Sequence, residues 1–588
     1  MLRRPHPWPI RRLSTLGRRA RSTLAQVVAG VARLRFGALV VPADALERRL
    51  IEAATSTVMG ESLVLTIITA NVGAHGQDVV DARARRALER AAEPSLTDPS
   101  FTDPEAQARA RLNLARAIAT FHERAGGILR PLEVLESTAG ASSGSGGRAG
   151  RLVALRQNAR LLRSGVSYGG PLRRDWEPVP GRVLYYANQT LPHHSSGYAI
   201  RTHGLARALR AKGWALSVYA RLGYPNDRYD FIGVQTADAA AEIDGVPYRF
   251  TPEGRRGRSI TDYQRASVET LVGHCAEVRP SILHAASNYT GGLAGTEVAR
   301  RLGIPSVYEV RGLWHMTRGA AQPEYLDSDH YRMIERLEVQ AAIHADHVFA
   351  ITEAVAQVLI RGGVAADRIS VLPNAVDAAA FTARARDPGL ERRWRLGGKV
   401  TIGYLGAFKD YEGLDHLLQA AALLRGRVGD TFRLLLVGDG ESADDLRALS
   451  KRLGLGSIVR FTGRVPHEAS PDYYALCDVM AYPRKGLRVC EVVSPIKPFE
   501  AMAAHRAVVV SDVGALTEIV RHEETGLVHR ADDVGSLADQ LERCLREPSL
   551  RSNLATGGHD WVVERRTWSR VADRVDRVYR RLTGRGNR

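Results

Sequence analysis

The chain has 588 residues, which is too long for a single hydrophobic core and indicates roughly three or four domains. Hydrophobic residues make up 44% and charged residues 25%, as in ordinary soluble globular proteins. No run approaches the roughly 20 apolar residues that a membrane-spanning helix needs. The four cysteines lack Cys-x-x-Cys spacing, so we expect a reducing, cytoplasmic setting with neither disulfide bonds nor structural zinc.

The formal charge of +18 is unevenly distributed, because residues 1–43 carry nine arginines and no acidic residue. Apolar residues are interleaved with these arginines, and such a segment can lie on an anionic membrane surface. A signal peptide fits less well, since Arg33 and Arg35 interrupt the apolar stretch that follows Ala25. A disordered tail and a nucleic-acid-binding arm are the alternatives, and no recognition motif supports the latter. We therefore expect a protein that is peripheral at the inner membrane face and binds no nucleic acid.

The next segments do not look catalytic. Residues 44–137 contain apolar residues at helical spacing, for example in EAQARARLNLARAIATFHE at 105–123, and predict a small helical module. Residues 138–150, which read TAGASSGSGGRAG, have the composition of a flexible linker. Residues 151–180 are expected to form a connecting helix.

From Gly181 onward, short β-branched or aromatic runs alternate with amphipathic helices, which predicts an α/β fold with doubly wound parallel sheets. One such domain is expected at 181–385 and a second at 386–566, with ligands bound in the cleft between them at the carboxyl ends of the strands. An arginine-rich helix at 567–588 is expected to cross back to the first domain. The predicted strands are Val183–Ala187, Leu216–Tyr219, Ile282–Ala285, Ser306–Val310, His347–Ile351, Val400–Tyr404, Phe432–Val437, Ile458–Thr462, Val479–Tyr482 and Ala507–Ser511.

Several common enzyme motifs are absent. Neither domain has G-x-G-x-x-G after its first strand, which disfavours a nicotinamide or flavin enzyme. The Walker and H-E-x-x-H patterns are missing too, and there is no G-x-S-x-G elbow between a strand and a helix. What remains is a set of small-residue loops after strands, several of which open helices and present backbone N–H groups to anions. They read LPHHSSGY at 191–198, GAFKDYEG at 406–413, GDG at 438–440 and VSPIKPFE at 493–500. In the last loop, Ser494 or a neighbour is expected to cap a helix that has prolines in its first turn.

These pieces resemble the retaining glycosyltransferases of family 4, of the type found in cell-surface polysaccharide synthesis. The resemblance covers about 400 residues from Gly181 onward and rests on the number, order and spacing of its pieces. It implies the GT-B fold, in which two Rossmann-like domains face each other across a cleft. The matching pieces are SGYAIRTHGLARALRAKGW (196–214), ILHAAS (282–287), VYEVRGLW (307–314), ADHVFAITE (345–353), LPNAVD (372–377), LLLVGDGES (434–442), FTGRVPHE (461–468) and EVVSPIKPFEAMAAHRAVVVSDVGALTEIVRHEETGLV (491–528).

The resemblance also assigns roles to residues. Family members hold the nucleotide diphosphate with a small-residue loop, here Ser196–Gly197, and with basic residues, here Lys409 and Lys497. Glu500 matches the glutamate that bonds the ribose hydroxyls, and Glu491 corresponds approximately to the one that faces the donor sugar. Such enzymes usually need no metal, so we expect no cofactor besides the nucleotide-sugar substrate. The remaining donor-binding positions are Gly406, Gly438, Asp439, Gly463, Arg464, Val465 and Ser494.

Some positions depart from the family pattern. The first loop of the second domain has Ala407 and Glu412 where an arginine and a lysine are usual, which leaves Lys409 as its single cation. Arg311 replaces a histidine that often follows the fourth strand; it could bind phosphate or acceptor, or equally form a structural ion pair with Glu309. We expect retaining transfer from a UDP- or GDP-sugar to a glycan or lipid-linked acceptor. The alternatives are a catalytically degenerate binding or assembly subunit and a nucleotide-sugar epimerase.

Overall fold

The computed structural model of this chain divides into two compact units, each of which is described by itself. The first comprises residues 1–163 and 327–332, and the second residues 164–326 and 333–588. The structure describes the following residues: 46, 50, 53, 54, 60–75, 77–91, 104–137, 146–173, 175–228, 238–253 and 259–585. The basic segment at 1–43, and with it the predicted membrane contact, lies outside the described residues.

The first unit is helical throughout its described part. Its apolar core includes Ile67, Leu114 and Ile118, of which the last two lie in the segment 105–123 whose spacing predicted a helix. The Asp329 carboxylate accepts hydrogen bonds from the backbone N–H groups of Ile128 and Leu129, at 3.0 and 2.9 Å, and so ties residues 327–332 to this unit. The helices are α3 (Gly60–His75), α4 (Gln77–Arg90), α5 (Pro104–Arg124), α6 (Leu129–Glu136) and α7 (Gly146–Ser164). Helix α7 therefore begins inside the range predicted as a linker.

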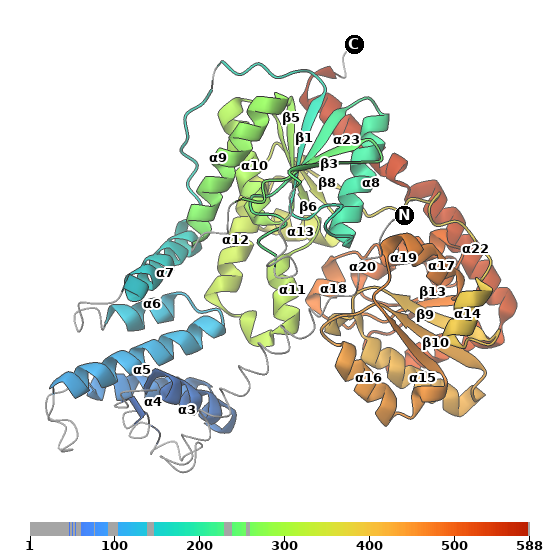
Figure 1. Ribbon diagram of the computed structural model, residues 1–588, viewed down its shortest axis with the longest axis horizontal. Helices are drawn as coiled ribbons and strands as arrows, with labels where there is room; N and C mark the ends of the chain where they lie inside the picture. The colour runs from blue at the N-terminus through green and yellow to red at the C-terminus, as the bar shows by residue number, and fades with distance from the viewer. Residues whose placement is uncertain are drawn as a thin grey trace, which may run out of the picture. The chain divides into compact units, whose positions relative to one another are not determined.

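The second unit contains two parallel sheets, of which the first has eight strands (Figure 1). Its order is β3-β4-β2-β1-β5-β6-β7-β8, and only β3 runs antiparallel to its neighbour. Short apolar runs form these strands because residues of a two-sided parallel sheet are buried on both faces. The strands are β1 (Arg182–Ala187), β2 (Ala215–Ala220), β3 (Ala240–Ile243), β4 (Val246–Arg249), β5 (Ile282–Ala286), β6 (Ser306–Val310), β7 (His347–Ala350) and β8 (Ile369–Val371).

Helices cover both faces of this sheet. Val183 and Tyr185 of β1 belong to the core beneath α8 and α23, whereas Tyr186, which points to the other face, lies beside Gly291 of α10. The helices are α8 (Gly197–Ala211), α9 (Ile260–Val278), α10 (Tyr289–Leu302), α11 (Trp314–Ala321), η3 (Pro323–Tyr325), α12 (Asp329–Ile343), α13 (Glu353–Arg361) and η4 (Ala366–Arg368).

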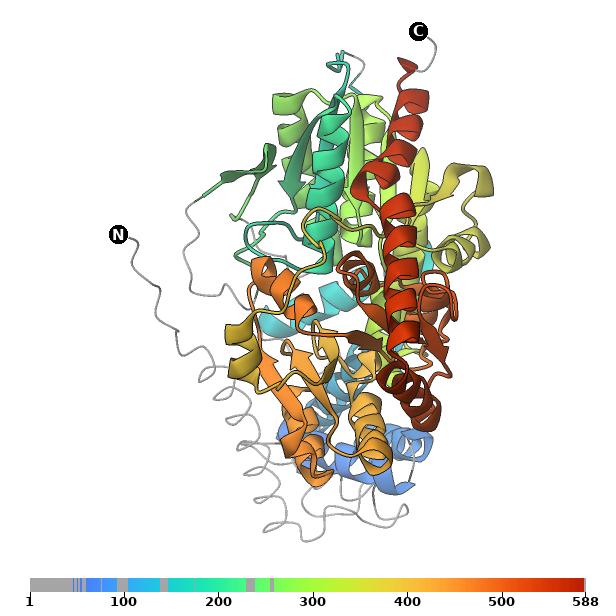
Figure 2. The same ribbon diagram turned by 90° about the vertical axis from the view of Figure 1, so that its right-hand side faces the viewer.

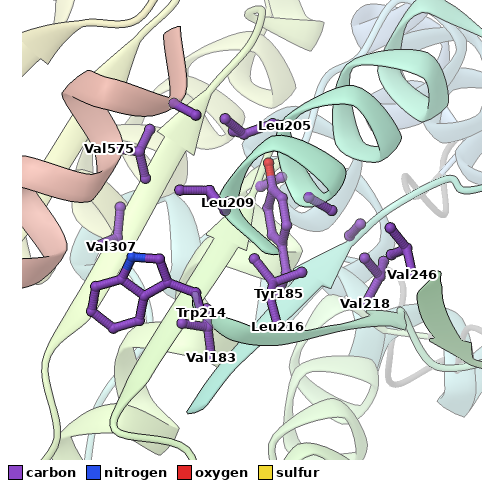
Figure 3. Close-up of a cluster of buried hydrophobic side chains, with 14 of the residues drawn as sticks. Val183, Tyr185, Leu205, Leu209, Trp214, Leu216, Val218, Val246, Val307 and Val575 are labelled. Atoms are coloured by element: carbon purple, nitrogen blue, oxygen red, sulfur yellow. The ribbon is translucent and has the colours of Figure 1, made fainter. Parts of the chain in front are cut away.

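The last helix of the chain, α23 (Trp568–Leu582), belongs to this first sheet rather than to the second. Val571, Val575 and Tyr579 are buried in the same core as Leu205 and Leu209 of α8. Figure 3 shows Val575 facing the side chains of α8 and of the strands, and in Figure 2 the red α23 runs alongside the sheet. The chain thus returns from the second domain to the first.

The second sheet has six parallel strands in the order β11-β10-β9-β12-β13-β14. The strands are β9 (Val400–Leu405), β10 (Phe432–Val437), β11 (Val459–Gly463), β12 (Val479–Tyr482), β13 (Ala507–Ser511) and β14 (Leu527–His529). Its helices are α14 (Pro388–Trp394), η5 (Asp410–Glu412), α15 (Leu414–Val428), α16 (Ala443–Arg452), η6 (Leu455–Ser457), η7 (His467–Ala469), α17 (Ser470–Ala475), α18 (Arg488–Val492), α19 (Lys497–Ala503), α20 (Gly514–Thr517), α21 (Val534–Arg546) and α22 (Pro548–Arg565).

The two doubly wound sheets confirm the predicted fold class, and all ten predicted strands are present within one or two residues of their predicted ends. The hairpin of β3 and β4 and the edge strands β8 and β14 were not predicted, because their runs are only three or four residues long. No helix among the described residues is both long and apolar enough to cross a membrane.

Candidate functional site

Three loops after adjacent strands of the second sheet pack backbone against backbone. The Gly406 N–H donates to the carbonyl oxygen of Val437 at 2.9 Å, and the Gly438 N–H donates to that of Gly463 at 3.0 Å. Gly438 has a φ of 138°, and a Cβ there would lie 1.9 Å from the carbonyl oxygen of Gly406. Only glycine tolerates that approach. The structure therefore brings three of the predicted donor-binding glycines to one edge of the sheet.

Lys497, the first residue of α19, reaches this same edge. Its Nζ lies 2.8 Å from Oε1 of Glu412 and donates to the Tyr404 hydroxyl at 2.6 Å. A Cβ on Gly406 would lie 2.8 Å from Cδ of Lys497, so the ammonium group and the glycine loop are direct neighbours. Burial lowers the pKa of Lys497, against the opposing charge of Glu412.

Glu412 joins Lys497 to a second cation, Arg484, which sequence reasoning did not select. Nη2 of Arg484 lies 3.0 Å from Oε1 of Glu412, and its Nη1 donates to the carbonyl oxygen of Val493 at 2.8 Å. Burial opposes ionisation of Glu412, but the charges of Arg484 and Lys497 outweigh it and lower the pKa of Glu412 to about 2. The cluster of Glu412, Arg484 and Lys497, here called the 412 cluster, thus carries one net positive charge.

A positional signal for Arg484 exists in the sequence. It stands two residues after the strand β12, and the carboxyl ends of parallel strands meet at one edge of a sheet. The acid at position 412, which was noted as a departure from the family pattern, is the partner that holds both cations at that edge.

The two predicted glutamates lie on different short helices. Glu500 on α19 is buried, and its Oε2 accepts a hydrogen bond from the Tyr474 hydroxyl at 2.9 Å. Burial raises the pKa of Glu500 to about 7, although the neighbouring charge of Lys497 acts in the opposite direction. Glu491 on α18 is exposed, and its Oε2 accepts from the N–H of Gly514 at 2.6 Å. Their contacts with ribose and sugar stay predictions.

The remaining predicted residues of this domain are less constrained. Lys409 is 41% exposed and pairs with the exposed Glu441 at 2.9 Å, so it is not part of the 412 cluster. Asp439 bonds the N–H of the neighbouring Gly440. Arg464 is exposed, and Val465 is half-buried.

Ser494 does not cap α19, contrary to the sequence prediction. The N-cap residue of α19 is Ile496, whose side chain cannot accept a hydrogen bond, and the carbonyl oxygen of Ser494 instead accepts from Nδ2 of Asn374 at 2.9 Å. Pro498 does lie in the first helical turn, where a missing N–H costs little.

The first domain contributes the start of α8. Ser196 is its N-cap, accepts from the N–H of Ala199 at 3.4 Å and donates to Oε1 of Gln189 at 3.1 Å. A Cβ on Gly197 would lie 3.8 Å from the side chain of Ile496, the residue before Lys497. The Ser196–Gly197 loop therefore lies beside the segment that leads into α19, as expected for two halves of one site.

A second buried charge cluster lies beneath α8. Glu309 of β6 pairs with Arg201 at 2.6 Å and with Arg311 at 2.7 Å, and His284 lies 3.5 Å away. Burial opposes ionisation of Glu309, but the charges of Arg311 and Arg201 dominate and hold its pKa well below the usual range. These residues are called the 309 cluster.

Arg311 forms the ion pair that was one of its two predicted roles. Its Nη1 donates to Oγ1 of Thr202 at 2.7 Å and to the carbonyl oxygen of Tyr198 at 3.0 Å, both in α8. The side chain is 3% exposed, so Arg311 positions α8 against β6. A direct contact with phosphate or acceptor stays a prediction.

Comparison with known proteins agrees with this architecture. Residues 196–375 match the family described as Glycosyl transferase 4-like domain, and residues 399–547 match Glycosyl transferases group 1. The fold resembles that of sucrose-phosphate synthase from Thermosynechococcus elongatus, with a TM-score of 0.56, 20% identity and coverage of 69% of this chain and 100% of the other.

Two curated relatives have a higher sequence identity over a smaller part of this chain. The 2-deoxystreptamine glucosyltransferase of Streptomyces kanamyceticus is 32% identical over 46% of this chain and 69% of its own length. The GDP-mannose-dependent alpha-(1-6)-phosphatidylinositol monomannoside mannosyltransferase of Mycobacterium tuberculosis is 32% identical over 35% of this chain, and the match spans about half of that relative, 54%. These matches and the two-sheet fold show that the chain belongs to the family 4 glycosyltransferases of the GT-B fold.

Proposed function

We propose that the protein transfers a sugar, with retention of anomeric configuration, from a UDP- or GDP-sugar to a glycan or lipid-linked acceptor. The observation that carries the proposal is the 412 cluster, in which the buried Arg484 and the mostly buried Lys497 share one carboxylate beside the Gly406 loop. A single net positive charge at a fixed position stabilises a diphosphate as it departs, because the site need not reorganise during the reaction.

Each residue then has a defined part in the reaction. The bond between the anomeric carbon and the β-phosphate oxygen breaks, and the acceptor oxygen bonds to the same face of that carbon while its proton passes to the departing phosphate. Lys497 faces the developing negative charge, Glu500 bonds the ribose, and Glu491 faces the sugar. Backbone N–H groups near Ser196–Gly197 contact the diphosphate from the first domain.

Two observations support a nucleotide-sugar donor: the charge beside the glycine loop and the name of one relative. Cations held beside a glycine loop suit a diphosphate, and the mycobacterial relative is GDP-mannose-dependent by name. The base, UDP or GDP, is left open. Attachment at the inner membrane face through residues 1–43 and a role in cell-surface polysaccharide or glycoconjugate synthesis belong to this proposal as well.

The test is incubation with a panel of nucleotide sugars and glycan or lipid-linked acceptors. We expect acceptor-dependent release of UDP or GDP and a product whose anomeric configuration, read by NMR, equals that of the donor. Nucleotide binding without turnover for any acceptor would identify a binding subunit instead, and interconversion of the donor sugar without an acceptor would identify an epimerase.

Metal independence is a further part of the proposal. Because the 412 cluster supplies the positive charge that a divalent cation would otherwise supply, we expect the transfer rate to be unchanged by EDTA. Loss of activity with EDTA and recovery with Mg²⁺ or Mn²⁺ would show that the diphosphate needs a metal in addition to Lys497.

A further inference from the structure

Four arginines lie in a row along α23. Arg570, Arg574, Arg577 and Arg581 are spaced by four, three and four residues, which places them on one face of the helix. At the rise of an α-helix, the row extends over about 16 Å. All four side chains are exposed. These residues are called the arginine row.

The opposite side of α23 explains why the row faces outward. Val571, Val575 and Val578 are buried against the first sheet, so the helix is fixed in rotation by its apolar face. The arginines therefore form a rigid array rather than a flexible basic tail. Figure 2 shows α23 in red along the side of the first sheet.

Two hollows flank the row. The smaller, of about 550 Å³, lies between the row and the edge strand β8 and is lined by Ser370, Val371, Arg574, Arg577, Val578 and Arg581. The larger, of about 640 Å³, extends from the row to α20 and α22, and its lining includes Thr517, Trp561, Arg566, Arg570, Arg574 and Arg577.

The acids around the larger hollow are already engaged. Asp573 pairs with Lys212, Glu564 lies 3.3 Å from Arg565, and Glu518 accepts from the backbone N–H groups that begin α13. By contrast, Arg570 and Arg577 form no ion pair within the part of the chain that the structure describes.

One further arginine that lines the larger hollow, Arg566, has a hydrogen-bond donor that no described residue satisfies. Arg566 lies 5.0 Å above the ring of Trp561, and its buried Nε has no hydrogen-bond partner among the described residues. An unsatisfied buried donor is costly, and here it lies beside the uncompensated cations of the row. Both features point to an anionic ligand in the larger hollow.

We propose that the arginine row and its two hollows bind the phosphate groups of an anionic phospholipid bilayer. A planar guanidinium group donates two parallel N–H hydrogen bonds to the oxygens of one phosphate, and a straight array on one rigid helix fits a planar layer of charged headgroups. Trp561 lines the larger hollow, and tryptophan side chains favour the interface between headgroups and acyl chains. The surface does not depend on the transfer reaction and involves no residue of the 1–43 segment.

The first experiment is co-sedimentation of the full chain with phosphatidylcholine vesicles, with and without phosphatidylglycerol. Each arginine at an anionic bilayer contributes roughly a fivefold change in binding, so Arg574→Gln with Arg577→Gln should weaken binding to the anionic vesicles by tenfold or more. The matched control is Arg392→Gln with Arg393→Gln, which removes the same charge from two exposed arginines of α14 and should leave binding unchanged.

The second experiment separates this surface from any contact made by residues 1–43. All four native cysteines are buried, so a fluorophore can be placed selectively on Thr517→Cys in the larger hollow, or on Ser457→Cys as a distant exposed control. With spin-labelled lipid as quencher in the anionic vesicles, we expect quenching at position 517 and little at 457. The double substitution of the row should abolish the quenching at 517.

Three results would overturn the proposal. The label at 517 could stay unquenched while the protein sediments with vesicles, or the two double variants could weaken binding equally. Soluble polyphosphate could also change the fluorescence of the 517 label while anionic vesicles do not, which would make the row a site for a soluble anion. A failure of the sugar-transfer assay would leave all of these outcomes interpretable, because none of them measures transfer.

Discussion

The two charge clusters of the second unit are built on the same plan but have different surroundings. Each places one buried glutamate between two cations beside a tyrosine, Glu309 with Arg201 and Arg311, and Glu412 with Arg484 and Lys497. In the 309 cluster, Arg201 also bonds the carbonyl oxygens of Leu372 and Pro373. In the 412 cluster, Lys497 borders a glycine loop at the carboxyl edge of the sheet.

The difference shows that a buried ion cluster can serve either structure or chemistry, according to what its cations face. The cations of the 309 cluster hold β6, α8 and the segment after β8 together, so their hydrogen bonds and charge are directed to groups of the protein itself. Lys497 is 15% exposed and faces an edge where ligands bind in open α/β sheets, so its charge is available to a substrate. Four experiments test this distinction.

The largest effect is expected for Glu309→Ala. The substitution leaves Arg201 and Arg311 buried without their shared counter-ion, and breaking a buried pair in this way costs about 3–5 kcal/mol. Denaturant unfolding should show that loss. Asp539→Ala, which removes an exposed partner of Arg427, should cost at most about 1 kcal/mol. Equal losses for the two variants would mean that the 309 cluster is not structural.

Lys497→Met should act on the reaction rather than on the fold. It removes the charge that faces the leaving diphosphate and leaves Glu412 paired with Arg484, so we expect kcat to fall about 100-fold or more with nearly unchanged unfolding. The control is Lys485→Met, a lysine of the same loop region that pairs with Asp410 and Asp415 instead. A similar loss of kcat in both variants would remove the special role of Lys497.

The pH dependence of stability offers a smaller effect. Burial raises the pKa of Glu500 and of Glu338 from 4.5 to about 7 in the folded state. Between those values the folded protein binds more protons than the unfolded chain, so the free energy of unfolding decreases as the pH rises from about 4.5 to 7. Each group contributes at most about 1.4 kcal/mol per pH unit. Glu500→Gln and Glu338→Gln should each reduce that slope, measured by unfolding at several pH values.

Added nucleotide should distinguish the contributions of these two glutamates to the pH dependence. If Glu500 bonds the ribose, saturating UDP or GDP should alter its contribution to the slope, whereas that of Glu338, which bonds the Tyr308 hydroxyl and the Tyr289 N–H, should stay the same. With nucleotide bound, the free energy of unfolding of Glu500→Gln should then depend on pH as it does in the unmodified protein. Equal changes at Glu338 would place the nucleotide elsewhere.

The smallest effect is expected for Lys409→Met. Lys409 is 41% exposed and paired with Glu441, so the ion pair contributes less than about 1 kcal/mol to stability. We expect little change in unfolding and a much smaller loss of kcat than in Lys497→Met. A loss as large as that of Lys497→Met would show that the 406–413 loop moves Lys409 onto the diphosphate when donor binds.

The sequence predicted the loops of the site better than its cations. Gly406 and Gly438 follow short strands rich in apolar residues and Gly463 ends a third strand, and in a parallel sheet the carboxyl ends of neighbouring strands must share an edge. Lys497 and Glu500 were predicted because both lie in VSPIKPFE at 493–500, a stretch that resembles the family pattern. Arg484 has a positional signal two residues after β12, but its pairing with Glu412 was not predictable, because Glu412 lies 72 residues earlier in the chain.

Arg201 illustrates the same limit in the first domain. In the helix SGYAIRTHG it reads as one more polar helix residue, yet its side chain is 2% exposed and bonds the segment 372–374, more than 170 residues away. Local periodicity reports which face of a helix is apolar, but it does not report which distant carboxylate or carbonyl a buried guanidinium meets.

Alternating apolar runs and glycine loops are local signals, so the class of fold, the family and the sheet edge that carries the glycine loops could be predicted from the sequence. The three-dimensional packing was needed to show which cations lie at that edge. It assigned Arg311 to the packing of α8, joined Arg484 and Lys497 through Glu412, and turned the arginines of α23 into a rigid row. These assignments depend on pairing across many residues, which is set when the two sheets and the returning helix pack together.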